Sequence, residues 1–136
     1  MGKNKGQGSV EFVILLSVMM LVFLLFFVVI QNRLIEAQHK ENERIAEEVA
    51  DIVFNEVRLA KSVSEGFTRV FELPTRINGF DYNIELLDDT DLVIVFEGRE
   101  YVFFLDENVS GNVSPGVNSI EKFHNRTIIY NKSVWT

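Results

Sequence analysis

FVILLSVMMLVFLLFFVVI, residues 12–30, is a nineteen-residue run whose only polar member is Ser17. As an α-helix it would rise about 28 Å, close to the ~30 Å hydrocarbon core of a bilayer. A surface helix of a soluble domain keeps one polar side, and this run has none. The run could instead be a buried core helix, but the remaining chain is too short to enclose such a helix on all sides. The sequence therefore predicts a transmembrane helix.

The remainder of the 136-residue chain is polar and acidic. It is long enough for one modest hydrophobic core, and not for two full domains. The net charge of −7 argues against nucleic acid as a partner, because nucleic-acid binding normally requires a basic surface. The chain contains no cysteine, which excludes disulfides and thiolate chemistry.

Lys3 and Lys5 precede the apolar run, and this bias predicts a cytoplasmic N-terminus with the bulk of the chain outside the cell. A secretory signal peptide would have an apolar region of about 7–15 residues and a small-residue cleavage site. Here the run is longer and is followed by IQNRLIEAQHK. Myristoylation would need Ser or Thr at the position of Gly6.

The stretch KGQGSVEFVIL, residues 5–15, has a recognisable spacing. It resembles the class III signal peptide of archaeal type IV pilin-like proteins, in which a basic leader ending in Lys-Gly precedes Gln-x-Ser-x-Glu-x-x-x-Leu and a long hydrophobic helix. The matching residues are Lys5, Gly6, Gln7, Ser9, Glu11 and Leu15. The resemblance covers about fifteen residues, and they lie between a basic leader and a spanning helix, the context that the motif requires.

The resemblance implies that a prepilin peptidase cuts between Gly6 and Gln7 at the cytoplasmic membrane face, so that Glu11 becomes the fifth residue of the mature chain. It also implies other pilin subunits, an assembly ATPase and a membrane platform as partners. Before assembly, the partner of the helix would be membrane lipid.

Glu11 has a physical rationale of its own. A charged carboxylate in hydrocarbon costs about 2.5–3.5 kcal/mol and favours a partner. Cleavage would create an α-amine four residues upstream, and this amine, from a neighbouring copy or from the same chain, could pair with Glu11. The alternative is a first-turn glutamate that interacts with the helix dipole and reaches the interface.

Residues 31–65 contain no Pro or Gly, and Gly66 follows as a C-cap. Helical spacing of apolar residues predicts an amphipathic continuation of the helix, with the core positions Ile45, Val49, Ile52, Val53, Val57 and Ala60. We interpret the acidic outer face of this segment as solvated.

From Phe67 the pattern is typical of strands. FDYNIEL alternates apolar and polar residues, Asn78-Gly79 precedes it as a turn signal, and LVIVF and YVFFL flank a hairpin loop at residues 97–99. With VFEL and TIIY, this gives three to five antiparallel strands. The expected fold class is α+β, with a long N-terminal helix packed on a small antiparallel sheet.

The expected organisation has four parts. Residues 1–6 are a cleaved leader, 7–30 a transmembrane or filament-core helix, 31–65 an amphipathic extension, and 66–136 an extracellular β domain.

No constellation of catalytic residues is recognisable, and we expect a non-enzyme without cofactor. His39, near Glu36 and Glu43, and His124, after Glu121, lack the second histidine or cysteine that a transition-metal site needs. Residues 88–91, Asp-Asp-Thr-Asp, lack the glycine and the distal glutamate of a calcium loop, and we interpret them as an acidic turn.

Four Asn-x-Ser/Thr sequons lie in the last thirty residues, at Asn108, Asn112, Asn125 and Asn131. They predict N-linked glycan acceptors, although turn-rich segments are also rich in Asn and Ser. Pro115 after the second sequon would weaken it.

The resulting functional hypothesis is a major or minor pilin-like subunit of a glycosylated surface filament with an adhesive outer domain. The alternative is a single-pass anchored extracellular binding protein that does not polymerise.

Overall fold

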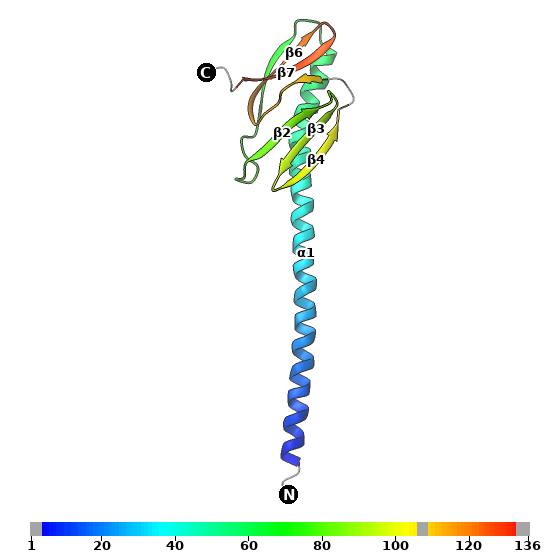
Figure 1. Cartoon of the computed structure of the whole chain (residues 1–136), viewed down its shortest axis with the longest axis vertical. Helices are drawn as coiled ribbons and strands as arrows, with labels where there is room; N and C mark the ends of the chain where they lie inside the picture. Colours follow the sequence, from blue (N-terminus) through cyan, green and yellow to red (C-terminus); the bar gives the residue numbers. More distant parts are fainter. Residues whose placement is uncertain (1–3, 106–108, 133–136) are drawn as a thin grey trace. The chain divides into compact units, whose positions relative to one another are not determined.

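The computed structural model describes residues 4–105 and 109–132, as one helix and seven strands (Figure 1). Helix α1 runs from Asn4 to Ser62. The strands are β1 (Thr68–Leu73), β2 (Tyr82–Leu87), β3 (Asp91–Phe96), β4 (Arg99–Phe104), β5 (Val109–Gly111), β6 (Gly116–Phe123) and β7 (Arg126–Asn131). The predicted α+β class is confirmed. Residues up to 40 form a first compact unit, and residues from 41 onward form a second.

The first unit consists of the N-terminal part of α1. Every described side chain from residue 6 to residue 38 is exposed, including the whole apolar run. Its ion pairs lie beyond that run, where the carboxylate of Glu36 is 3.9 Å from Arg33 and 3.8 Å from Lys40. These surface pairs contribute little to stability.

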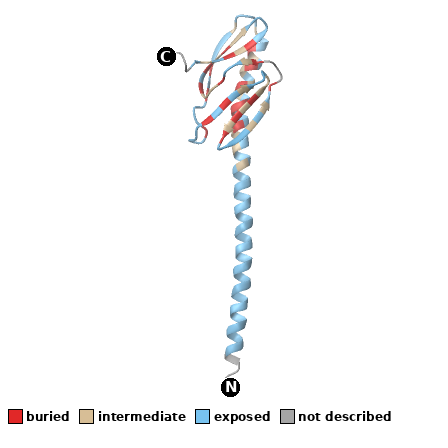
Figure 2. Cartoon of the chain, viewed as in Figure 1, coloured by how far each residue is buried: buried red, intermediate tan, exposed pale blue. Residues whose placement is uncertain are grey.

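The second unit is built on the last part of α1, whose inward face carries small and β-branched side chains. Ala46, Ala50, Val53 and Ala60 are completely buried, and Val49 and Val57 nearly so. Figure 2 shows buried residues gathered where both sheets meet this part of α1. The predicted helical core face is confirmed, with Ile45 and Ile52 at its partly buried border.

The strands form two sheets instead of one. β2, β3 and β4 make an antiparallel sheet in sequence order, and the other sheet has the order β1-β6-β7-β5. Its last pair, β5 with β7, is parallel, while the remaining pairs are antiparallel. At this pair the backbones approach so closely that a Cβ on Gly111 would lie 2.0 Å from the carbonyl oxygen of Ile129. Only glycine fits there.

Tight turns set the strand registers. Asn78-Gly79, Glu97-Gly98 and His124-Asn125 all have positive φ at both residues, the geometry that matches the twist of an antiparallel hairpin. The predicted turn at Asn78-Gly79 and the predicted loop between β3 and β4 are therefore confirmed. Asp88 and Asp89, also at positive φ, form the turn between β2 and β3, in agreement with the predicted acidic turn.

The C-terminal end of α1 is fastened to the hairpin of β6 and β7. The Nζ of Lys122 donates to the carbonyl oxygens of Lys61 and Val63, both at 2.8 Å. The backbone N–H of Asn125 donates to the carboxylate of Glu65 at 3.1 Å. Lys122 thus satisfies carbonyl groups that a helix end leaves without intrahelical partners, and its charge complements the helix dipole. The helix ends at Ser62, three residues before the predicted limit, where the Ser62 hydroxyl donates to the carbonyl of Leu59.

Lys122→Met should lower the free energy of unfolding of the second unit by about 1–2 kcal/mol, because two charge-assisted hydrogen bonds are lost. Denaturation of the detergent-solubilised chain, followed by near-UV circular dichroism, measures the change. Lys132→Met is the matched control, since Lys132 is exposed. Equal stability of the two variants would show that Lys122 does not hold the helix end.

Tyr82 provides a second, pH-dependent test of the core. Its hydroxyl donates to the carbonyl of Pro74 at 2.5 Å, and burial raises its pKa to about 12. Because the folded pKa lies above the unfolded value, the neutral phenol stabilises the fold below about pH 10, and this contribution is lost as the pH rises toward 12.

We therefore expect wild type to be more stable than Tyr82→Phe near neutral pH, by about 1 kcal/mol for the hydrogen bond. This advantage should shrink or reverse between pH 10 and 12. Urea denaturation across this pH range is the measurement, and Tyr130→Phe, at a half-exposed tyrosine, is the matched control. A constant gap for Tyr82→Phe would contradict the assignment.

Candidate assembly helix and surface of the second unit

The residues of the predicted processing and assembly motif all lie on α1. Gln7, Glu11 and Leu15 are spaced by four and follow one side of the helix, whereas Ser9 projects from nearly the opposite side. The side chains of all four are exposed. The motif residues are therefore distributed along the helix, and their side chains do not come together at one site. Such a pattern can be recognised by a protein that binds the unwound segment, or by neighbours on more than one side.

The predicted cut site falls within the helical residues. α1 includes Lys5, Gly6 and Gln7, while Lys3 and the start of the leader lie outside the described residues. A peptide bond in a helix is shielded, so a peptidase must unwind it. Gly6 and Gly8 make that easier, since each glycine destabilises a helix by about 1 kcal/mol relative to alanine. A Cβ added at either glycine would meet no atom within 4 Å, so neither glycine is needed for packing.

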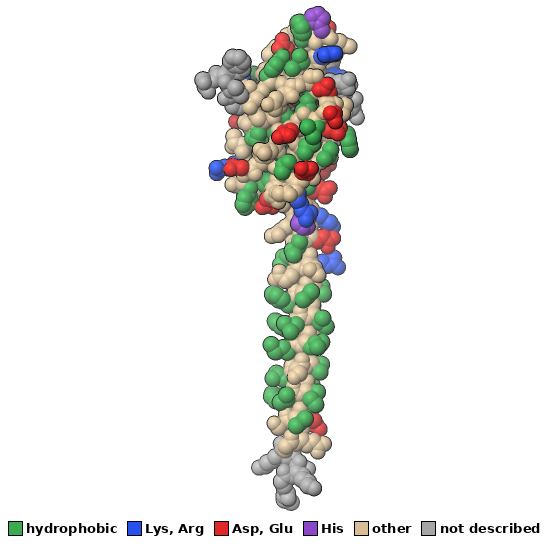
Figure 3. Space-filling view, in the orientation of Figure 1, with side chains coloured by type: hydrophobic (Ala, Val, Ile, Leu, Met, Phe, Trp, Pro, Cys, Tyr) green, Lys and Arg blue, Asp and Glu red, His purple; other side chains and the backbone are tan. Residues whose placement is uncertain are grey.

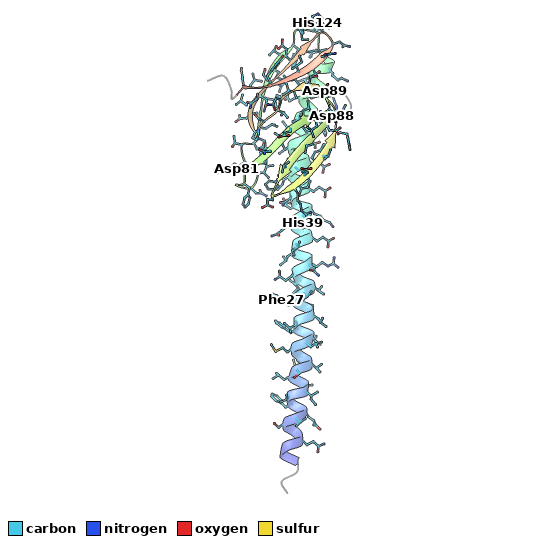
Figure 4. All side chains as sticks on the ribbon, viewed as in Figure 1. Phe27, His39, Asp81, Asp88, Asp89 and His124 are labelled. Carbon is cyan, nitrogen blue, oxygen red and sulfur yellow. The ribbon has the colours of Figure 1, made fainter. Side chains whose placement is uncertain are left out.

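The side chains of the apolar run are exposed on every side of the helix. α1 is long and apolar enough to cross a membrane by length and composition, a property shared by membrane anchors and signal sequences. Figure 3 shows hydrophobic side chains covering the visible face of this segment, and Figure 4 shows Phe27 projecting outward from it. Ser17 donates its hydroxyl to the carbonyl of Val13 at 2.8 Å, so its one polar group is satisfied within the helix. The segment is thus compatible with lipid or with other apolar helices around it.

Glu11 immediately precedes this apolar segment. Its side chain is exposed, and no ion-pair or hydrogen-bond partner reaches it among the described residues. Inside a membrane or a helix bundle, the carboxylate would need a cationic partner from outside the described part of the chain. Within the described part of the first unit, Glu11 is therefore a carboxylate that lacks the cationic partner it would need in an apolar environment.

The residues considered as metal ligands do not converge. His39 lies on α1 in the first unit, and His124 lies in the turn of β6 and β7, with its ring centroid 4.1 Å from that of Phe123. Asp88 and Asp89 lie together at the turn of β2 and β3 (Figure 4). Within residues 4–105 and 109–132, no group of three potential ligands is close enough to hold a metal ion.

The four sequons differ in their surroundings. Asn108 lies outside the described residues. Asn112 and Asn125 are exposed, and Asn131, at the end of β7, is half-buried. The threonine of the Asn125 sequon, Thr127, is only 5% exposed and belongs to β7. Glycan acceptance at these sites stays a prediction, and among the three sequon asparagines that the structure describes, Asn112 and Asn125 are more exposed than Asn131.

Two surface features of the second unit were not predicted from the sequence. One is a groove of about 320 Å³ between α1 and the segment that joins β1 to β2. Its floor is apolar, and its rim carries two arginines, two glutamates and an asparagine. The lining includes Arg44, Ile45, Ile52, Pro74, Arg76 and Ile77.

The second feature is Phe104, which is 74% exposed and ends the edge strand β4. Val102 lies beside it on the same face and is 47% exposed. The five-residue apolar run YVFFL could have signalled this, because a strand with one buried face alternates, whereas this strand is apolar on both faces. The groove had no such local signal, because its walls come from segments far apart in sequence.

No family model matches this chain, and neither curated proteins nor solved structures give a match to it. The structure has a pilin-like topology, in which a long apolar N-terminal helix continues into an amphipathic part packed on small β-sheets.

Proposed function

We propose that this chain is a structural subunit of an archaeal type IV pilus-like surface filament. The observation that carries the proposal is the motif of residues 5–15, placed at the start of an apolar helix whose sides are all uncovered. A simple membrane anchor needs the apolar helix. It does not need a Lys-Gly cut site followed by a glutamate at the edge of hydrocarbon.

The proposed sequence of events begins with a prepilin peptidase. It removes residues 1–6 at the cytoplasmic membrane face, and the new chain starts at Gln7. The helix remains in the bilayer, and the second unit lies outside the cell as the outer unit. An assembly ATPase and a membrane platform then transfer the helix into the filament. The role is structural and not enzymatic, and the outer unit would carry adhesion and glycans.

The energetics of this transfer favour specific contacts. Lipid tails and neighbouring apolar helices are similar surroundings for residues 12–30, so apolar burial changes little. The α-amine of Gln7 and the carboxylate of Glu11 from adjacent copies would neutralise each other. Such a pair forms only at one stagger between helices, so it would select the register as well as stabilise the bundle.

Mass spectrometry of the N-terminus tests the processing step. The mature chain from membranes or filaments should begin at Gln7, and Gly6→Leu, which changes the cut site and leaves the motif from Gln7 onward unchanged, should keep residues 1–6. A wild-type chain that begins at Met1 or Gly2 would instead support a permanent single-pass anchor.

Glu11→Gln should reduce filament yield at least about tenfold while the processed subunit still accumulates in the membrane, because the amide keeps the size and removes the charge. Filaments sheared from cells and counted by electron microscopy give the yield. Glu36→Gln is the matched control, since Glu36 lies on the same helix with only exposed surface pairs. Normal filaments from the Glu11→Gln chain would rule out charge pairing.

A further inference from the structure

The groove on the second unit is suited to an uncharged, compact side chain. Its apolar floor includes Ile45, Ile52 and Ile77. The charges on its rim are already paired within the chain. Arg44 contacts Glu41 at 2.8 Å and Glu48 at 2.6 Å, and Arg76 contacts Asp81 at 3.0 Å.

The hydrogen bond from Arg44 also lowers the pKa of Glu41. A charged ligand would have to compete with these contacts, whereas an apolar one would leave them in place. The chemistry of the groove therefore points to an apolar occupant.

The size of the groove agrees with an aromatic ring. A closed apolar cavity of about 150 Å³ accommodates benzene. The open groove of about 320 Å³ therefore has room for a phenyl group.

Phe104 is the apolar side chain that fits this description best. It is the most exposed large hydrophobic residue of the described chain, at 74%. It lies on the edge strand β4, and its neighbour Val102 is on the same face of the sheet. Leu87 of β2 is on this face too, because both Phe104 and Leu87 are register partners of Asp91 in β3. Exposing this much of a phenyl group to water is unfavourable in free energy unless another surface covers it.

The groove and Phe104 lie on opposite sides of the second unit. Arg76 of the groove is bonded to Asp81, and Phe104 is opposite Asp91 in the sheet register, close to the turn that contains Asp88. Figure 4 shows Asp81 on one side of this unit and Asp88 on the other. One copy therefore cannot bury its own Phe104 in its own groove, and a contact between them joins two copies.

We propose that Phe104 of one copy inserts into this groove of a second copy of the same chain. The interaction is heterologous, because each copy contributes Phe104 on one side and the groove on the other. Contacts of this kind can repeat without closing, and repetition without closure generates filaments. The inference rests on the proposed filament function and specifies how the outer units of adjacent subunits meet.

The area of the contact explains why it would work only between anchored copies. A phenyl group and two aliphatic neighbours bury on the order of a few hundred Å². Stable soluble complexes bury about 1,200–2,000 Å². The contact is thus too small to hold free copies together. It becomes effective when packed helices already keep the copies close, through a high effective concentration.

Because the chain has no cysteine, engineered cysteines can test the contact directly. The test variant combines Val102→Cys, beside Phe104, with Glu48→Cys on the groove rim, so that Phe104 itself stays in place. Mild oxidation of filaments and membranes should then produce a ladder of disulfide-linked dimers, trimers and longer species on a non-reducing gel. Each single cysteine variant should yield no ladder.

Three further variants make the result specific. Val70→Cys with Glu48→Cys places the first cysteine at an equally exposed valine, at 49%, on another strand, and should give no ladder. Adding Phe104→Ala to the test variant should reduce the ladder at least about fivefold, because the buried ring is lost. Adding Phe123→Ala, which removes a 55% exposed phenylalanine elsewhere, should not.

The outcomes separate this inference from the proposed function. Filaments that form normally but give no ladder, or give the same ladder with Val70→Cys or without Phe104, would overturn the Phe104 contact and leave the filament role standing. Absence of wild-type filaments, with an unprocessed N-terminus, would overturn both.

Discussion

The apolar helix of residues 12–30 needs surroundings that its own chain does not provide. Nineteen residues with one polar member are exposed on every side, and the hydrophobic core of the second unit is already filled by the later part of the same helix. Lipid or other apolar helices must therefore cover it. This requirement explains why the chain is divided into a segment that depends on its environment and a segment that buries its own core.

The self-contained segment is organised around small side chains. Ala46, Ala50 and Ala60 allow the backbone of α1 to approach the sheets, while Val53 and Val57 fill the space between them. Glu56 and Arg69, at 3.1 Å, add an ion pair between the helix and β1, and Phe54 meets the ring of Phe103 edge-on. Contacts to both sheets thus hold one helix face, and the opposite face remains available to water.

The sequence predicted those features that have a local cause. Uniform hydrophobicity predicted the membrane-compatible helix, spacing predicted Val49, Val53 and Val57 as core, and turn residues predicted the hairpin of β3 and β4.

β5 and β6 were missed, because SPGVNSI has the composition of a turn-rich loop. Asn118 in this stretch is nevertheless fully buried, and its side chain forms hydrogen bonds with the backbone of Ser114 and Gly116. That role depends on tertiary context, as does the reach of Lys122 to the end of α1. The motif of residues 5–15 was recognisable because its residues are contiguous in the sequence. The groove near Pro74 forms only when helix and loop residues come together in the folded unit.

The order of the strands also has a consequence for synthesis. β1 follows the helix directly, but its neighbour is β6, and the intervening strands β2, β3 and β4 pair only among themselves. When β1 leaves the ribosome it has no partner, and the alanine-valine face of α1 is not fully covered until β6 has been translated. The nascent second unit therefore passes through a stage in which β2, β3 and β4 can already be paired while β1 is still unpaired. Any factor that protects the newborn chain from aggregation would have to act during this interval.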